Sequence, residues 1–186
     1  MKRMAFVLVP ASLAAAAPVA IAQSDLGLKR VGVALGYTDP EQLGGTFSVG
    51  GFADHGTIAP RLGLESRLEY WSSSDETFGA GTSLRDISLG ARGKFSFPVE
   101  NSRIRPFAGA GLGIHFLKAA VSTPPQFGFP AFSVAGSSTE LGLDLGGGIA
   151  TDLGPRTDLL AEAWFGIVDT ANTFSLRAGL SRKLGS

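Results

Sequence analysis

The sequence predicts an all-β fold: an eight-stranded antiparallel up-and-down barrel that spans a membrane. Three observations support this prediction. Large apolar residues alternate with glycine or charged residues in eight separate segments, and a period of two indicates a β-strand with two unlike faces. Links rich in glycine, proline, asparagine and serine separate the segments. After residue 22 no apolar run is long enough for a membrane helix, so strands that cross lipid must close into a barrel.

The clearest segment covers residues 104–117 and contains the run RPFAGAGLGIHF. Leu112, Ile114 and Phe116 share one parity, whereas the other parity carries mainly glycines and His115. Glycine is unfavourable on a solvent-exposed strand because it adds entropic cost and no packing. A strand with one apolar face and one face of mainly glycine therefore indicates a narrow barrel whose large side chains face lipid.

The four segments that precede it alternate in the same way. Residues 29–37 alternate valine, leucine and tyrosine with glycine, alanine and arginine. Residues 46–53 alternate least clearly, and we expect a β-bulge at Gly50-Gly51. Residues 60–71 set leucine and tyrosine against arginine and glutamate, and residues 84–97 set isoleucine, leucine and phenylalanine against serine, arginine and lysine. A tilted strand needs about 9–11 residues to cross a membrane.

Three further segments complete the predicted ring. They cover residues 139–152, 157–167 and 173–184, and in each of them leucine, alanine or phenylalanine alternates with acidic residues, glycine, serine or arginine. The links alternate too, because short turns follow the second, fourth and sixth segments, while longer loops at 72–83 and 118–138 follow the third and fifth. Bacterial barrels place short turns in the periplasm and longer loops outside, so the predicted topology is self-consistent.

Residues 1–22 are expected to be a signal peptide cleaved after Ala22, which leaves residues 23–186 as one barrel domain. Lys2 and Arg3 precede an apolar stretch, and Ala20-Ile21-Ala22 is a small-residue cleavage site. Cleavage lowers the 16 basic residues to 14 against 16 acidic residues, and this near balance gives no reason to expect nucleic-acid binding. The chain has no cysteine, which excludes a disulfide scaffold.

The polar parity of the segments is predicted to face the barrel interior. Its charges have both signs, and buried charges must pair with one another. Because side chains just fill the interior of an eight-stranded barrel, we expect a salt-bridged lumen network with a structural or gating role. The predicted network consists of Glu65, Arg67, Glu69, Arg92, Lys94, Arg105, His115, Glu140, Asp144, Glu162 and Arg177. The alternative is an exported, soluble, lipocalin-like barrel with the two faces exchanged.

The loop predicted at 118–138 has an unusual composition. It is apolar and aromatic where a surface loop is normally polar, and exposed apolar patches often mark contact sites. The candidate surface-contact residues are Pro124, Pro125, Phe127, Phe129, Pro130 and Phe132. Alternatively, the loop folds onto its own rim.

Several stretches resemble a known family. RPFAGAGLGIHF, ELGLDLGGGIATDLG, AEAWFGI and FSLRAGLSRKL are similar to the outer-membrane β-barrel family that includes the OmpA and OmpX transmembrane domains. The resemblance implies a monomer in the outer membrane of a Gram-negative bacterium, inserted by the barrel-assembly machinery and surrounded by membrane lipid and lipopolysaccharide. One departure is the end of the chain, because family members commonly finish on an aromatic residue and this sequence finishes Leu184-Gly185-Ser186.

Catalytic and metal-binding patterns are weak. His55 is expected in a solvated turn after the second segment, and His115 has no accompanying serine and acid pattern for hydrolysis. Two separated histidines without cysteine give no metal-ligand cluster, and we expect no cofactor. The leading hypothesis is a non-enzymatic outer-membrane barrel with a structural or surface-interaction role. The alternatives are a narrow porin-like channel for small solutes, a lipid A-modifying enzyme that uses His115, and the soluble binder.

Overall fold

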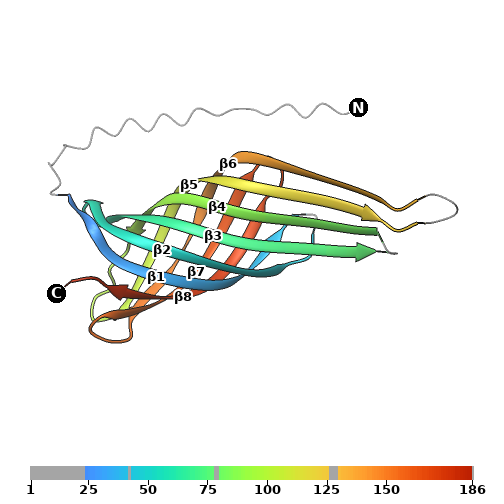
Figure 1. Ribbon diagram of the computed structural model, residues 1–186. Coiled ribbons are helices and arrows are strands. Elements are labelled where there is room, and N and C mark those ends of the chain that lie inside the picture. The colour runs from blue at the N-terminus through green and yellow to red at the C-terminus, as the bar shows by residue number, and fades with distance from the viewer. Residues whose placement is uncertain (1–23, 42, 78–79, 126–129, 186) are drawn as a thin grey trace, which may run out of the picture.

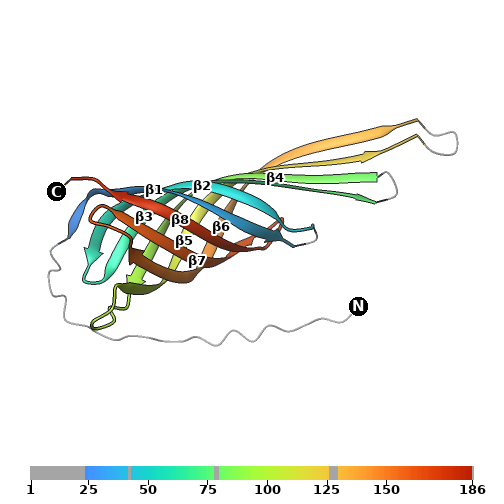
Figure 2. The ribbon, with the colours of Figure 1, turned by 90° about the horizontal axis from the view of Figure 1, so that it is seen from below.

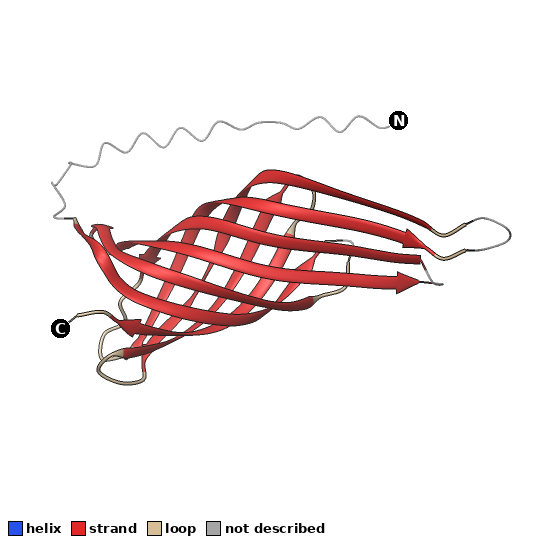
Figure 3. Ribbon diagram, in the orientation of Figure 1, coloured by secondary structure: helices blue, strands red, loops and turns tan. Residues whose placement is uncertain are grey.

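The computed structural model describes residues 24–41, 43–77, 80–125 and 130–185, which form a closed barrel of eight antiparallel strands (Figures 1 and 3). The strands are β1 (Asp25–Pro40), β2 (Thr46–Ala59), β3 (Leu62–Thr77), β4 (Ala80–Ser96), β5 (Ile104–Thr123), β6 (Phe132–Asp152), β7 (Thr157–Val168) and β8 (Thr173–Lys183). Each strand pairs with its neighbours in sequence, and β8 closes the ring on β1. The described segments include no helix that is long and apolar enough to cross a bilayer. The expected signal peptide at 1–22 lies outside the described residues.

The strands are strongly staggered around the ring. A path that starts at Arg30 and follows directly paired residues from strand to strand returns to β1 at Pro40, ten residues further along. The path passes through Asp54, Glu65, Arg92, Gly111, Asp144, Gly166 and Thr173. A stagger of this kind tilts the strands by about 35–45° to the axis and gives an eight-stranded barrel that is just wide enough for its interior side chains.

The apolar parity faces outward, as the sequence predicts. On the isolated barrel the side chains of Leu35 and Leu112 are 67% and 68% exposed, whereas Glu65 and Arg92 are only 5% and 3% exposed. A water-soluble barrel would bury such leucines and expose such charges. The lipocalin-like alternative is therefore wrong, and the outer surface is a belt suited to hydrocarbon.

The two ends of the barrel differ. We call one end the turn end, because it carries the short links at 60–61, 97–103 and 153–156; both described termini also lie there (Figures 1 and 2). The opposite end is called the hairpin end. Exposed aromatic side chains lie toward both ends of the apolar belt, with Phe95 and Phe97 packed edge to face at the turn end. Such aromatic girdles are typical of the two membrane interfaces.

At the hairpin end, β3, β4, β5 and β6 continue past the other four strands as a paired sheet (Figure 2). Residues 72–77 of β3 pair only with β4, and residues 132–141 of β6 pair only with β5. The loops predicted at 72–83 and 118–138 are therefore mostly strand, and this part of the prediction is wrong. Serine and glycine suggested turns, but four neighbouring strands satisfy one another's backbone hydrogen bonds beyond the belt. We call this sheet the β3–β6 extension.

The predicted bulge in β2 lies elsewhere. Gly50 and Gly51 pair in regular register with β1, whereas the pairing of β2 with β3 shifts between Asp54 and Thr57. At this point Gly56 has φ +80°, which favours glycine, and its N–H donates to the Asp54 carboxylate at 2.7 Å. His55 consequently lies within the strand, 2.8 Å from the Ser66 hydroxyl, and not in a solvated turn.

Leu112→Arg should lower the free energy of unfolding from lipid by about 2–4 kcal/mol, because arginine near the middle of the lipid-facing belt carries a cost of that size. Val121→Arg, on the β3–β6 extension, should change it by less than about 0.5 kcal/mol. Equilibrium urea unfolding in phosphatidylcholine vesicles measures both values. Equal costs for the two substitutions would contradict the outward assignment of Leu112.

Candidate functional site

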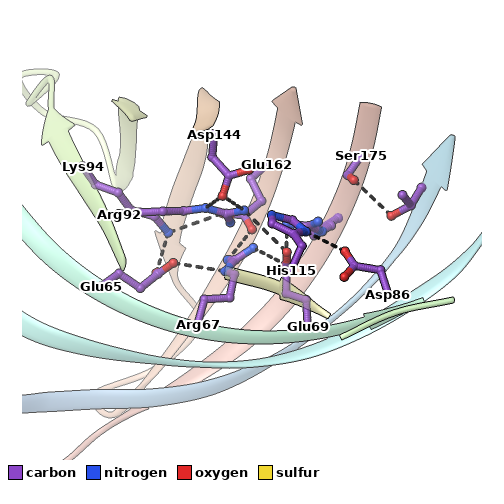
Figure 4. A network of polar contacts seen from close by, with 12 residues as sticks. Glu65, Arg67, Glu69, Asp86, Arg92, Lys94, His115, Asp144, Glu162 and Ser175 are labelled. Atoms are coloured by element: carbon purple, nitrogen blue, oxygen red, sulfur yellow. Dashed lines mark hydrogen bonds and ion pairs between the residues drawn. The ribbon is translucent and has the colours of Figure 1, made fainter. Parts of the chain in front are cut away.

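The candidate site is the barrel lumen, where inward-facing charged side chains from β3, β4, β6, β7 and β8 meet (Figure 4). Eight of the residues expected there form one connected ion-pair network: Glu65, Arg67, Glu69, Arg92, Lys94, Asp144, Glu162 and Arg177. Each belongs to the polar parity of its strand, so the period of two brings all of them inside.

Arg67 lies at the centre of this lumen network. Its guanidinium contacts Glu65 at 3.3 Å and Glu69 at 3.0 Å, and it also pairs with Glu162. The Arg67 side chain is almost fully buried, and the Glu162 side chain has no exposed surface. Because an unpaired charge in such a place is very costly, these residues hold one another in place.

Two further cations extend the network over aromatic rings. The Arg92 guanidinium donates to Asp144 at 2.8 and 3.0 Å and lies 4.1 Å from the centroid of the Trp164 ring. The Lys94 ammonium lies 2.5 Å from Glu65 and 4.8 Å from the Phe107 ring. Cation–π contacts of this kind strengthen when water is excluded. Trp164 was not among the residues predicted to form the network, although its parity places it inside.

Glycines make room for these large side chains. A Cβ atom at Gly111 would lie 2.5 Å from Cγ of Arg92, and one at Gly146 would lie 2.8 Å from the Trp164 ring. Neither distance is compatible with normal packing. The glycines that the sequence shows on the inward parity therefore leave the space that the side chains of the network occupy.

His115 lies inside the barrel but outside the lumen network. Its Nδ1 atom is 2.7 Å from Oδ2 of Asp86, and both side chains are buried. Ser88 is the cross-strand partner of His115, but no hydroxyl of a described residue hydrogen-bonds to the imidazole. Asp86 was absent from the predicted network, because no local pattern separates a partner of His115 from other inward polar residues.

The two remaining predicted residues lie near the ends of the lumen. At the turn end, Arg105 pairs with Asp152 at 2.7 Å and with Asp158 at 3.4 Å. At the hairpin end, the Glu140 carboxylate accepts from the Ser138 hydroxyl at 2.7 Å and from the backbone N–H of Thr170 at 2.9 Å. Both residues stabilise the rims of the barrel.

The lumen is closed toward the hairpin end. A buried apolar cluster covers the network there, and it consists of Trp71, Leu84, Leu117, Val168 and Ala171. Between Arg92 and His115 the network leaves a cavity of about 10 Å³, which is scarcely room for one water molecule. A larger cavity of about 140 Å³ lies toward the turn end, between Lys94 and Arg30. Within the described ranges, no group of three or more histidine or acidic side chains is placed to hold a metal ion.

The candidate surface-contact residues are only partly described. Phe127 and Phe129 lie outside the described residues, while Pro124, Pro125 and Pro130 flank the ends of β5 and β6. Phe132 begins β6 and is 61% exposed. These described residues lie at the far end of the β3–β6 extension.

Comparisons with known proteins agree with this architecture. The profile of the family described as outer membrane protein beta-barrel domain matches residues 6–183. The chain is similar in structure to Neisserial surface protein A, with 20% identity, a TM-score of 0.61, and 83% of this chain and 96% of that chain covered. A major outer membrane protein from Thermus thermophilus follows, with 14% identity, a TM-score of 0.55, and 85% and 100% covered.

A third similar structure is Ail, the attachment invasion locus protein of Yersinia pestis. It has 13% identity and a TM-score of 0.53, and the match covers 85% of this chain and all of Ail. At these identities the similarity establishes a shared eight-stranded fold. No curated protein matches the chain.

Glu162→Gln should destabilise the barrel by about 3–5 kcal/mol, because it removes a fully buried carboxylate that pairs with both Arg67 and Lys94 and leaves excess positive charge in the lumen. Glu140→Gln removes the same charge at the rim and should cost about 1 kcal/mol or less. Urea unfolding in lipid vesicles compares the two variants. Similar small losses would show that the lumen network contributes little to stability.

Proposed function

This chain belongs to the outer membrane protein β-barrel family, and from that premise we propose that it is a sealed, non-enzymatic barrel that holds the β3–β6 extension at the cell surface. It is an integral protein of the bacterial outer membrane. By the usual topology of such barrels, the turn end is periplasmic and the hairpin end is extracellular. The observation that carries the proposal is the filled lumen beneath a projecting sheet.

The filled lumen favours a structural role over the alternative of a channel. The lumen network occupies the middle of the barrel, and the apolar cluster around Trp71 and Leu117 covers it on the extracellular side. A solute would have to break several buried ion pairs and then displace a packed cluster. The cavity of about 140 Å³ near Arg30 ends at the network, so it supports a periplasmic recess and not a continuous pore.

The position of His115 favours a non-enzymatic role. Lipid A is a substrate of the outer leaflet, so an enzyme that modifies it needs reactive groups on the lipid-facing surface or at an open mouth. His115 instead lies inside, paired with Asp86 beneath the apolar cluster. Its Nε2 atom approaches the bare α-carbon of Gly142, where a Cβ would lie 2.6 Å away.

The β3–β6 extension supports a surface-interaction role. It raises a paired sheet beyond the ring, and its far end carries exposed Val134 and Phe132. We propose that the signal peptide is cleaved after Ala22 in the course of export, that the barrel-assembly machinery inserts residues 23–186, and that the barrel is a monomer among membrane lipids and lipopolysaccharide. Inside the belt the described strands form a ring without an unpaired edge, which removes one common reason for oligomerisation.

Planar lipid bilayer recordings test the sealed lumen. The wild-type protein and Arg85→Ala, which alters only the outer surface, should give no single-channel current. Arg92→Ala removes the side chain that joins Asp144 to the Trp164 ring, and it should produce measurable openings because it takes a large side chain out of the network. Stable current steps from the wild-type protein would support the channel alternative.

Cysteine labelling tests which end is displayed, since the chain has no cysteine of its own. Val134→Cys, on the β3–β6 extension, should react with a membrane-impermeant maleimide on intact cells. Arg156→Cys, in the turn between β6 and β7, should react only after the outer membrane is permeabilised. The reverse pattern of labelling would contradict the proposed topology.

A further inference from the structure

A row of four polar residues crosses the outer face of the barrel where the β3–β6 extension begins. Arg85 on β4 lies directly opposite Lys118 on β5, and Ser72 and Ser137 are their partners on β3 and β6. All four have the parity of the lipid-facing residues, so their side chains project from the outer surface and not into the lumen.

The row borders the apolar belt. One step toward the turn end on the same face, Tyr70, Ile87 and Phe116 form the adjacent row, and all three are exposed. Aromatic residues at this position mark the boundary between hydrocarbon and lipid headgroups. Arg85 and Lys118 therefore lie at the level of the headgroups of the outer leaflet.

Within the described part of the chain, neither cation is neutralised. Among the described residues no carboxylate forms an ion pair with Arg85 or Lys118, whereas every cation in the lumen network has one. Two like charges directly opposite each other on adjacent strands are destabilising. A bound anion would remove this repulsion.

The surface around the two cations is hollowed. A groove of about 460 Å³ on this face is lined by Arg85 and Lys118 together with serine, alanine and glycine residues. Small side chains leave the charged groups accessible, and the hydroxyls of Ser72, Ser83 and Ser137 add hydrogen-bond donors beside them. The combination of two cations and several hydroxyls suits the oxygens of a phosphate group.

We propose that Arg85 and Lys118 bind the phosphate headgroup of an outer-leaflet lipid whose acyl chains pack along the belt below Ile87 and Phe116. The inference rests on the proposed function, because it needs the hairpin end to be extracellular and the belt to be in lipid. The direct continuity of the groove with the belt favours a lipid over free phosphate, since the same molecule buries apolar surface and pairs its charge.

The test measures lipid binding to the folded barrel in neutral detergent by native mass spectrometry. The probes are a diphosphorylated, hexa-acylated glucosamine disaccharide lipid and the same lipid without phosphate. Arg85→Gln/Lys118→Gln is compared with Arg156→Gln/Arg182→Gln, which removes two exposed cations at the turn end that form no ion pair with a described residue. The conservative exchange Arg85→Lys/Lys118→Arg keeps both charges.

Arg85→Gln/Lys118→Gln should weaken binding of the phosphorylated lipid about tenfold, which corresponds to about 1.4 kcal/mol. The turn-end control and the conservative exchange should both bind the phosphorylated lipid like the wild-type protein. The wild-type protein should bind the lipid without phosphate only weakly, with about the affinity that Arg85→Gln/Lys118→Gln shows for the phosphorylated lipid. Unchanged binding in Arg85→Gln/Lys118→Gln would overturn the proposal. Equal binding of the phosphate-free lipid, or displacement of the lipid by millimolar inorganic phosphate, would also overturn it.

Folding and topology are checked separately. Each variant should keep the heat-modifiable migration of a folded barrel in SDS gels, because the exchanged residues lie outside the lumen network. A failed lipid assay with the wild-type labelling pattern at Val134→Cys and Arg156→Cys would remove the lipid site alone. A reversed labelling pattern would remove the proposed function together with the site.

Discussion

The structure depends on one constraint: a backbone that crosses hydrocarbon must satisfy its hydrogen bonds without water. Closing β8 onto β1 meets this constraint and at the same time fixes an inside and an outside. Every strand then has to send one parity into lipid and the other into a space that is narrow because the ring has only eight strands. The apolar outer face, the inward glycines and the paired charges of the lumen all follow from this geometry.

The lumen network shows how a narrow interior is filled. Large cations such as Arg67 and Arg92 span the space, carboxylates from facing strands neutralise them, and glycines such as Gly111 and Gly146 leave the volume that they need. Trp164 and Phe107 add apolar surface under the charged groups. The same residues thus fill the lumen and pair its charges, and for this reason little open space remains around the network.

Sequence parity predicted which face each residue occupies, but it did not predict the height of that residue along the barrel. Alternation is local, whereas height depends on the register summed over several strands. Glu140 and Asp144 share a parity on β6, yet only Asp144 reaches Arg92. The pairing of His115 with Asp86 and the bulge at Gly56 also depend on register, as does the continuation of β5 and β6 beyond the belt. A serine-rich strand that pairs only beyond the belt looks like a loop when it is considered alone.

The β3–β6 extension rises from one side of the ring only. Around β1, β2, β7 and β8 the rim stays low, so the molecule has a front and a back when it is seen from outside the cell. A macromolecule that moves along the membrane surface can reach the extracellular end of the barrel from the side of β1, β2, β7 and β8. From the opposite side, the β3–β6 extension blocks its approach. Rotation of the barrel about the membrane normal therefore changes which side the protein presents to its surroundings.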